Sequence, residues 1–207
     1  MKESINKIIK YLDDQEETRE ELLDISHRAI RKASSAMAAL HREDDEKFSE
    51  IIENIEGDIE KLNTILEKEP QFSDHGSLIA AHREFSEALL TNALMEGDEL
   101  PDPDEIKVHY KGYAQALAET TGELRRHLLD LLRKDDLEQA QKIHERMEKV
   151  FDHLERFDYP DSILSGMRHR RDVARKNLEK TRGDITRALR EKKLEKALKD
   201  AERSLED

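Results

Sequence analysis

The sequence predicts an all-α protein, and three observations carry that prediction. Only seven glycines and four prolines occur in 207 residues, fewer than a chain rich in turns would need. Glu, Lys, Leu, Ala and Arg, which favour helices, are abundant, whereas runs of β-branched residues are almost absent. Apolar residues also recur at the three- and four-residue spacing of amphipathic helices. Because the length fits one domain, we expect a single helical domain over residues 1–207.

The first two predicted helices fill the N-terminal third of the chain. One runs from Glu3 to about His41, with apolar residues at helical spacing on either side of the charged stretch DDQEETREE (residues 13–21). An acidic step that begins at Glu43 starts the second helix. This helix continues to about Glu69 and ends before Pro70.

Four more helices are predicted after Pro70. Ser73 or Asp74 caps the first of them, and the stretch GDELPDPD (residues 97–104) is the clearest loop in the chain. The expected helices span Gly76–Glu96, Glu105–Arg133, Leu137–Arg156 and Ser162–Arg190. The Lys- and Glu-rich tail over residues 191–207 is expected to fray, which leaves a core over about residues 20–190.

Composition excludes several classes of protein. No cysteine occurs, so disulfides and thiolate-based zinc or iron–sulfur sites are excluded. The N-terminal residues are charged throughout and nowhere do 18 apolar residues run together, so we expect a soluble cytoplasmic protein with no membrane partner. Only 36% of the residues are hydrophobic, which makes the core lean and indicates an oligomer that shares burial between subunits.

The charge is strongly negative overall but unevenly distributed. A net charge of −13 argues against nucleic-acid binding by the whole surface, because polyphosphate would be repelled at long range. Residues 164–196, however, carry 12 Lys and Arg against 5 acids. A local basic face therefore stays possible.

Two segments of low charge contain the candidate metal ligands. Charged residues make up 41% of the chain, yet residues 76–95 hold only Arg83, Glu84 and Glu87, and residues 112–124 hold only Glu119 and Glu123. Four carboxylates from two packed helices could hold Mg²⁺ or Mn²⁺, which prefer oxygen ligands and polarise a phosphodiester. The alternative is chance, because acids are so frequent that Glu pairs one turn apart arise in many places. A di-iron site is disfavoured, since none of the nine histidines follows a Glu by three residues.

Basic side chains near these acids, and a cluster on the first helix, are candidate phosphate contacts. Each of them could instead belong to a solvated helix face. The candidates are Arg28, Arg31, Lys32, His82, Arg83, Lys107, Lys111, Arg125 and Arg126.

Three segments resemble the translin superfamily, which comprises translin, translin-associated factor X and archaeal single-subunit relatives. GYAQALAETTGELRR (residues 112–126) resembles the family's Tyr-containing helix. HREFSEA (residues 82–88) resembles the factor X sequence around its two helix-borne acids, and ISHRAIRKASSAMAALHR (residues 25–42) is similar to the first long helix of that subunit. The segments keep their order, so the resemblance spans about residues 20–190.

The resemblance implies a bundle of about seven helices that assembles into a hollow homo-octamer around single-stranded RNA or DNA. In the family, factor X is the metal-dependent endoribonuclease and translin the non-catalytic binder. The catalytic acids of factor X fall on Glu84, Glu87, Glu119 and Glu123, which the resemblance makes both catalytic and metal-binding. The nuclease subunit has Asp at the position of Glu119, and the longer side chain leaves open whether activity is preserved.

Three functions compete at this point. The first is a Mg²⁺- or Mn²⁺-dependent endoribonuclease that acts on single-stranded RNA. The second is a translin-like binder of single-stranded RNA or DNA without chemistry, in which the acids form a partly buried polar network. The third is a structural helical bundle with neither activity.

Overall fold

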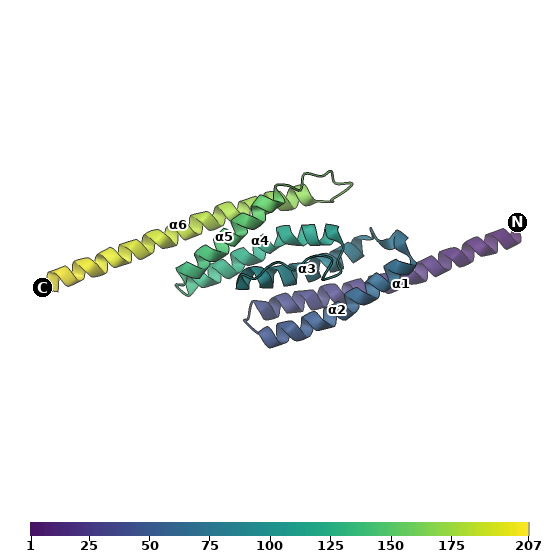
Figure 1. Cartoon of the computed structure of the whole chain (residues 1–207), viewed down its shortest axis with the longest axis horizontal. Coiled ribbons are helices and arrows are strands. Elements are labelled where there is room, and N and C mark those ends of the chain that lie inside the picture. The colour runs from purple at the N-terminus through teal and green to yellow at the C-terminus, as the bar shows by residue number, and fades with distance from the viewer. Residues whose placement is uncertain (207) are drawn as a thin grey trace. The chain divides into compact units, whose positions relative to one another are not determined.

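The computed structural model describes the backbone of residues 1–206 and the side chains of residues 1–204, and within these residues the chain is helical without strands. Seven helical elements follow in order (Figure 1). They are α1 (Lys2–Leu40), α2 (Asp45–Lys68), the 3-10 helix η1 (Pro70–Phe72), α3 (Gly76–Glu96), α4 (Tyr110–Arg133), α5 (Leu137–Leu154) and α6 (Met167–Glu206). The predicted all-α fold class is confirmed.

Two helices differ clearly from their predicted bounds. Helix α4 begins at Tyr110 instead of Glu105, because Lys107 adopts a left-handed φ of 54° that ends any helix before it. Helix α6 continues to Glu206, well past Arg190, because its last turns consist of strong helix formers such as Lys, Glu, Leu and Ala. Asp207, the end of the predicted tail, lies outside the described residues. Whether this tail frays in solution stays a prediction.

The chain divides into two compact units. One comprises residues 1–92 and 100–116, and the other comprises residues 93–99 and the chain from Leu117 onward. Helices α3 and α4 each contribute residues to both units. The prediction of a single domain therefore stays a prediction.

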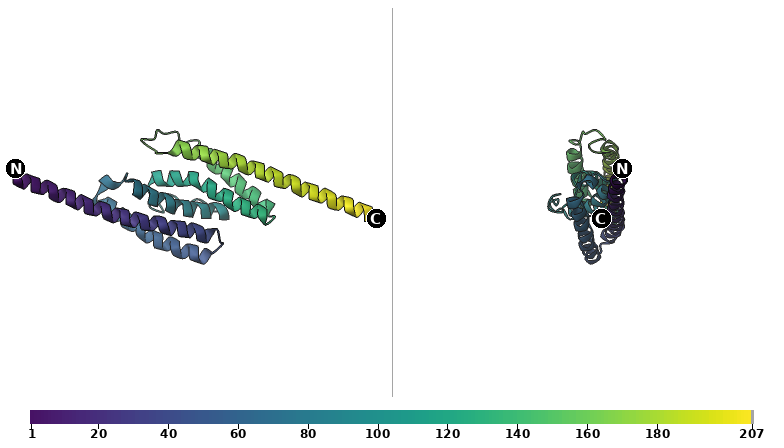
Figure 2. Two further views of the ribbon diagram at one scale, coloured as in Figure 1. Left: turned by 180° about the vertical axis from the view of Figure 1, so that it is seen from behind. Right: turned by 90° about the vertical axis from the view of Figure 1, so that its right-hand side faces the viewer.

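The first unit is built on the hairpin of α1 and α2, which lie side by side in Figures 1 and 2. Asp44 caps α2 by accepting a 3.1 Å hydrogen bond from the backbone N–H of Lys47. The apolar stripe of α2 is buried along its length, at Phe48, Ile52, Ile55, Ile59, Leu62 and Ile65. Each such large side chain contributes roughly 1.5–3 kcal/mol when it is fully buried. The apolar stripe that predicted α2 therefore also stabilises the hairpin through its burial.

The second unit contains the packed pair α5 and α6. Asp136 caps α5 by accepting a 3.0 Å hydrogen bond from the N–H of Gln139. Arg182 of α6 pairs with Glu148 of α5 at 2.8 Å, on the exposed side of this helix pair. Among the described residues, no helix combines the length and the apolar character that a membrane crossing requires.

Candidate metal and nucleic-acid site

Helix α3 carries Glu84 and Glu87 one turn apart, and both side chains are half-buried. The neighbouring positions Phe85, Ser86 and Ala88 are buried, so the apolar side of the helix fixes where the two acids point. Arg83 donates from its terminal NH2 to Oε1 of Glu84 at 2.7 Å, with both side chains about three-quarters buried. One candidate acid therefore already has a cationic partner beside it.

Helix α4 carries Glu119 and Glu123 one turn apart, again half-buried. The segment between them, Thr120-Thr121-Gly122, is poor helix sequence, yet the helix is continuous. The hydroxyls of Thr120 and Thr121 each donate at 2.8 Å to the backbone carbonyl three residues earlier, which satisfies these buried groups inside the helix. The two glutamates are thus held on a rigid helical backbone.

Three of the four predicted acids form a group that could hold a metal ion. Glu84, Glu87 and Glu119 each offer one carboxylate oxygen, and these atoms lie within 4.8 Å of one another. The donor set fits a hard divalent cation, since Mg²⁺ and Mn²⁺ prefer carboxylate oxygens and keep waters in their remaining positions. Glu123 follows Glu119 by one turn of α4 and stays a predicted member of the site.

The basic cluster predicted on the first helix is partly engaged in an ion-pair network. Asp58 of α2 is 2% exposed and accepts hydrogen bonds from Arg28 at 2.8 Å and Lys32 at 2.8 Å. Burial by itself raises the pKa of Asp58, but the bonds from Arg28 and Lys32 outweigh burial and leave that pKa lowered. The pKa of Arg28 is raised by the same hydrogen bond. Arg31, by contrast, is exposed.

His82, a predicted phosphate contact, lies in the interior. Its side chain is 1% exposed, and Nδ1 accepts a 2.8 Å hydrogen bond from the backbone N–H of His109. Burial, with a smaller effect of His109, lowers the pKa of His82 to about 4. Its hydrogen bond joins α3 to the residue before α4, and a phosphate contact by His82 stays a prediction.

The remaining predicted basic residues have mixed surroundings. Lys107 is exposed, whereas Lys111 pairs with Asp74. Arg125 donates to Asp184 at 2.7 Å and to the Thr181 hydroxyl at 2.8 Å. Arg126 is exposed. Among the predicted basic residues, Arg31, Lys107 and Arg126 are exposed, and Arg28 keeps 41% of its side chain exposed beside Asp58.

Comparisons with known proteins place these features in a family, although no family model matches the chain. An uncharacterised protein of Methanocaldococcus jannaschii is 31% identical over 199 residues, which cover 95% of this chain and 88% of that protein. The crystal structure of AfC3PO, from Archaeoglobus, matches with a TM-score of 0.81 and 26% identity over 89% of this chain and 96% of that one. C3PO is the complex of translin type. The chain belongs to the translin superfamily.

Two further solved structures share the fold. A complex of AfC3PO with duplex RNA matches this translin superfamily member with a TM-score of 0.70 and 27% identity. NeC3PO without ligand, from Nematostella, matches with a TM-score of 0.79 at 21% identity, which supports the fold alone. Each match covers 89% of this chain and 96% of the other chain.

The sequence of this translin superfamily member did not predict the partners of its site residues, among them Asp58, Arg170 and Asp184. A signal existed for Asp58, because it occupies a position on the otherwise apolar stripe of α2 between Ile55 and Leu62. Arg170 donates to Glu119 at 2.7 Å from 51 residues away, and no local pattern predicts such a pair.

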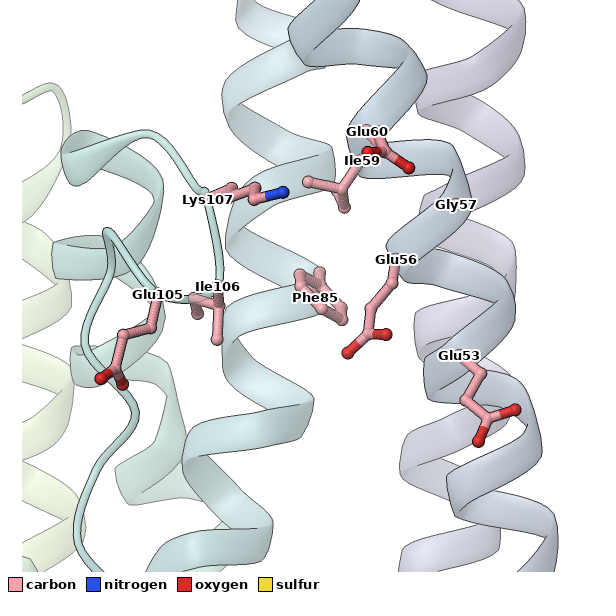
Figure 3. A pocket seen from close by; sticks show the side chains of 9 residues that line it. All are labelled: Glu53, Glu56, Gly57, Ile59, Glu60, Phe85, Glu105, Ile106 and Lys107. Atoms are coloured by element: carbon pink, nitrogen blue, oxygen red, sulfur yellow. The ribbon is translucent and has the colours of Figure 1, made fainter.

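The same translin-type chain has a pocket of about 440 Å³ in its first unit (Figure 3). It is lined by Glu53, Glu56, Gly57, Ile59 and Glu60 of α2, Phe85 of α3, and Glu105, Ile106 and Lys107 of the following loop. Four of the nine lining residues are acids and one, Lys107, is basic, so the lining as a whole is negatively charged.

Proposed function

We propose that this translin superfamily protein binds RNA and cleaves it as an endoribonuclease that depends on Mg²⁺ or Mn²⁺. The observation that carries the proposal is the group formed by Glu84, Glu87 and Glu119, whose carboxylate oxygens lie within 4.8 Å of one another. Three carboxylates at this separation repel each other unless cations neutralise them, and a divalent ion does so with ligands that it prefers.

RNA is the proposed ligand because AfC3PO, at 27% identity, forms a complex with duplex RNA. The resemblance of the sequence to the translin superfamily adds single-stranded RNA and single-stranded DNA to the proposed ligands. Arg31, Lys107 and Arg126 are exposed and able to contact phosphates, and such contacts position the polynucleotide without reading its sequence. We also propose a cytoplasmic homo-oligomer, with the octamer as the state implied by the family.

In this mechanism Glu84, Glu87 and Glu119 would hold the cation. A bound divalent ion would polarise the phosphodiester and lower the pKa of its water, which supplies the nucleophile. Glu123 would accept the proton from that water, since it follows Glu119 by one turn on the same rigid helix. Arg83, which already pairs with Glu84 at 2.7 Å, would keep that carboxylate oriented.

A cleavage assay tests the proposal. Purified protein is incubated with end-labelled single-stranded and duplex RNA in Mg²⁺, in Mn²⁺ and in EDTA, and the products are resolved on a denaturing gel. Glu87→Gln and Glu123→Gln are expected to reduce cleavage at least about a hundredfold while RNA affinity is kept. Glu60→Gln, an exposed acid of α2, is the matched control and should cleave like the wild type. Equal cleavage by all variants would show that Glu87 and Glu123 are not part of the site that cleaves RNA.

One observation favours a second candidate, a binder of RNA without chemistry. Two of the three clustered acids already have arginine partners, Arg83 with Glu84 and Arg170 with Glu119, each at 2.7 Å. Such pairs could make the group a polar network that needs no cation. The binder predicts a shifted but intact RNA band in Mg²⁺ and in EDTA alike, whereas a structural bundle predicts no shift even at low salt.

A further inference from the structure

The pocket of Figure 3, which we call the acidic pocket, has walls that hydrogen bonds of the chain hold in place. One wall is helix α2 and the other is the loop before α4. The side-chain amide of Asn63 on α2 donates a 2.9 Å hydrogen bond to the carbonyl of Lys107. The loop is also tied to α3, because Nδ1 of His82 accepts from the N–H of His109 at 2.8 Å. The space of about 440 Å³ is therefore preformed, at a size that is typical of small-molecule sites.

The floor of the acidic pocket is apolar, and its helical wall lacks one side chain. Phe85 and Ile59 line the pocket although they are only 1% and 2% exposed, and Ile106 of the loop joins them. Gly57 lies in the wall, in the interior of α2, where glycine weakens a helix relative to alanine. A Cβ at Gly57 would meet no atom of the described residues within 4 Å, so packing inside this chain does not require a glycine there. The missing side chain leaves open space at the pocket.

Three carboxylates of α2 line the pocket without a neutralising partner. Glu53, Glu56 and Glu60 are exposed, and within the described part of the chain none of their carboxylates forms an ion pair or a hydrogen bond. Their spacing of three and four residues puts them on one face of the helix, roughly 4.5 Å and 6 Å apart along its axis. Glu105 adds a carboxylate from the loop, and Lys107 is the one basic residue of the lining. The pocket therefore attracts cations.

A single metal ion does not fit the acids of the pocket. In the part of the chain that the structure describes, the acids close enough to share one ion are Glu84, Glu87 and Glu119, and none of them lines the pocket. A cation with several charges along a flexible chain fits the row on α2 better, because each carboxylate can meet its own ammonium group. Alkyl segments between the ammonium groups would leave water and lie against the apolar floor. Carboxylates and floor thus indicate the same class of ligand.

We propose that the acidic pocket binds a linear aliphatic polyamine of the spermidine class. Ammonium groups of the ligand pair with the glutamates of α2, and Figure 3 shows that the carboxylate of Glu56 points into the space toward Phe85. The alkyl chain lies over Phe85, in the space that Gly57 leaves open. Lys107 enters from the loop on the opposite side and weakens the attraction without reversing it, since four acids oppose one lysine.

Calorimetric titration of the RNA-free protein with spermidine at physiological salt tests the site. Glu53→Gln with Glu56→Gln should weaken binding at least about tenfold, because the pocket loses two of its attracting charges. Glu17→Gln with Glu20→Gln removes two exposed acids of the same spacing from α1 and should weaken binding less than about twofold, because salt screens distant charges. An equal loss in the two double variants, or no measurable binding by the wild type, would overturn the proposal.

Substitution of Gly57 tests whether the ligand uses the open space. Gly57→Leu should weaken spermidine binding at least about tenfold while the thermal midpoint is kept or raised, because leucine fills the space and is the better helix former. Gly183→Leu is the matched control, since this exposed helical glycine also has no atom within 4 Å of a Cβ, and it should bind spermidine like the wild type. Full affinity in a folded Gly57→Leu protein would contradict the proposed position of the ligand.

The charge of Lys107 gives a test of opposite sign. Lys107→Gln should tighten spermidine binding at least about twofold, because it removes the like charge from the lining. Weaker binding in this variant would show that attraction to the acids does not determine affinity, and would overturn the proposal.

Two further titrations separate this site from the group of acids proposed to hold a metal. Glu87→Gln, which lacks one proposed metal ligand, should bind spermidine as tightly as the wild type. Mg²⁺ at the same concentration as spermidine should not displace it, because its charge is confined to one point. Displacement by Mg²⁺, or loss of binding in Glu87→Gln, would overturn the assignment. RNA is absent from all of these titrations, so a failure of the proposed cleavage would leave their outcomes unchanged.

Discussion

The Nε atom of Arg170 donates a 2.7 Å hydrogen bond to Oε1 of Glu119, so a side chain of the protein itself holds one of the three clustered acids. The same guanidinium turns back over Gly166, which adopts a left-handed φ of 68°. A Cβ at Gly166 would lie 2.5 Å from Nη1 of Arg170, so glycine leaves the space for this turn. A cation that binds at the acids would therefore share Glu119 with Arg170.

Arg170→Gln is expected to tighten Mn²⁺ binding. The substitution removes the competing positive charge, and a partly buried pair of this kind is worth about 1 kcal/mol, or roughly fivefold in affinity. Titration of the RNA-free protein with Mn²⁺, followed by electron paramagnetic resonance, measures the effect. Arg168→Gln, an exposed neighbour on α6, should leave the affinity unchanged. Weaker binding in Arg170→Gln would mean that the arginine orients Glu119 for the ion.

Glu119→Asp and Glu119→Gln should behave differently. Asp keeps a carboxylate and matches the residue that the factor X resemblance implies, so cleavage is expected to stay within about tenfold of the wild type. Gln removes a charge from the proposed ligand set and should reduce cleavage at least about a hundredfold. Cleavage rates at saturating Mg²⁺ compare the two. Equal loss in both variants would show that side-chain length is as important as charge.

Much of the fold could be predicted because its signals are local. Periodicity predicted α3 over Gly76–Glu96 and the start of α5 at Leu137. The start of α4 could not be predicted, because it depends on the left-handed Lys107, a conformation that favours glycine and gives no sequence signal at lysine. Local rules thus gave the helices but not every junction between them.

The acids of the candidate site could be predicted from the sequence, but the side chains that surround them could not. Glu84, Glu87 and Glu119 stood out because they interrupt segments of low charge, and the structure groups them. The apolar stripe of α2 indicated that Asp58 is buried, but pairing depends on contacts between distant residues, so neither its partner Arg28 nor the pair of Arg170 with Glu119 was visible in any window of sequence. The burial of His82 has the same origin: a histidine between Ala81 and Arg83 is compatible with surface or core until the packing is known.

Asp58→Asn is expected to destabilise the protein by about 2 kcal/mol, because it removes one charge from bonds to both Arg28 and Lys32. The pKa of Asp58 is lowered in the folded state, so its contribution is present above the unfolded pKa of roughly 4 and is lost as pH falls through the folded value. Urea unfolding at pH 7 and at pH 3 measures both. The difference from wild type should shrink at the lower pH, and Glu60→Gln should show none.

The pairing with Asp58 also separates the roles of two arginines. Arg28→Gln should reduce stability, since Arg28 holds the buried carboxylate, whereas Arg31→Gln should reduce RNA affinity without changing stability. Urea midpoints and filter binding at low salt compare the two variants. The same effect in both assays for Arg28 and Arg31 would contradict this division.

The pH dependence of stability should report the burial of His82. Its folded pKa of about 4 lies below the unfolded value of roughly 6.5, so the unfolded state binds the proton first. The stability that the neutral imidazole provides is complete above pH 6.5 and is lost as pH falls toward 4, by roughly 3 kcal/mol. Comparison of urea midpoints at pH 7 and pH 5 should show a smaller change in His82→Leu than in wild type. His169→Gln, which removes an exposed histidine, should keep the wild-type change.

Gly112→Ala is expected to destabilise the protein although alanine is the better helix former. A Cβ at Gly112 would lie 3.0 Å from the carbonyl oxygen of Ile79 and 3.1 Å from the amide nitrogen of Arg83, both backbone atoms of α3. Those atoms cannot move as a flexible side chain can, so overpacking should exceed the gain of about 1 kcal/mol in helix propensity and leave a net loss of about 1–2 kcal/mol.

Gly183→Ala is the matched control, because this glycine also lies inside a helix and a Cβ there would meet no atom within 4 Å. Only the propensity term then acts, and the variant should be stabilised by up to about 1 kcal/mol. Urea unfolding of the two variants and of wild type gives opposite signs if the close approach of α3 and α4 at Gly112 is real. If both variants were stabilised, α3 would have to move enough to accommodate the added Cβ at Gly112. Only the gain in helix propensity would then affect the free energy of unfolding.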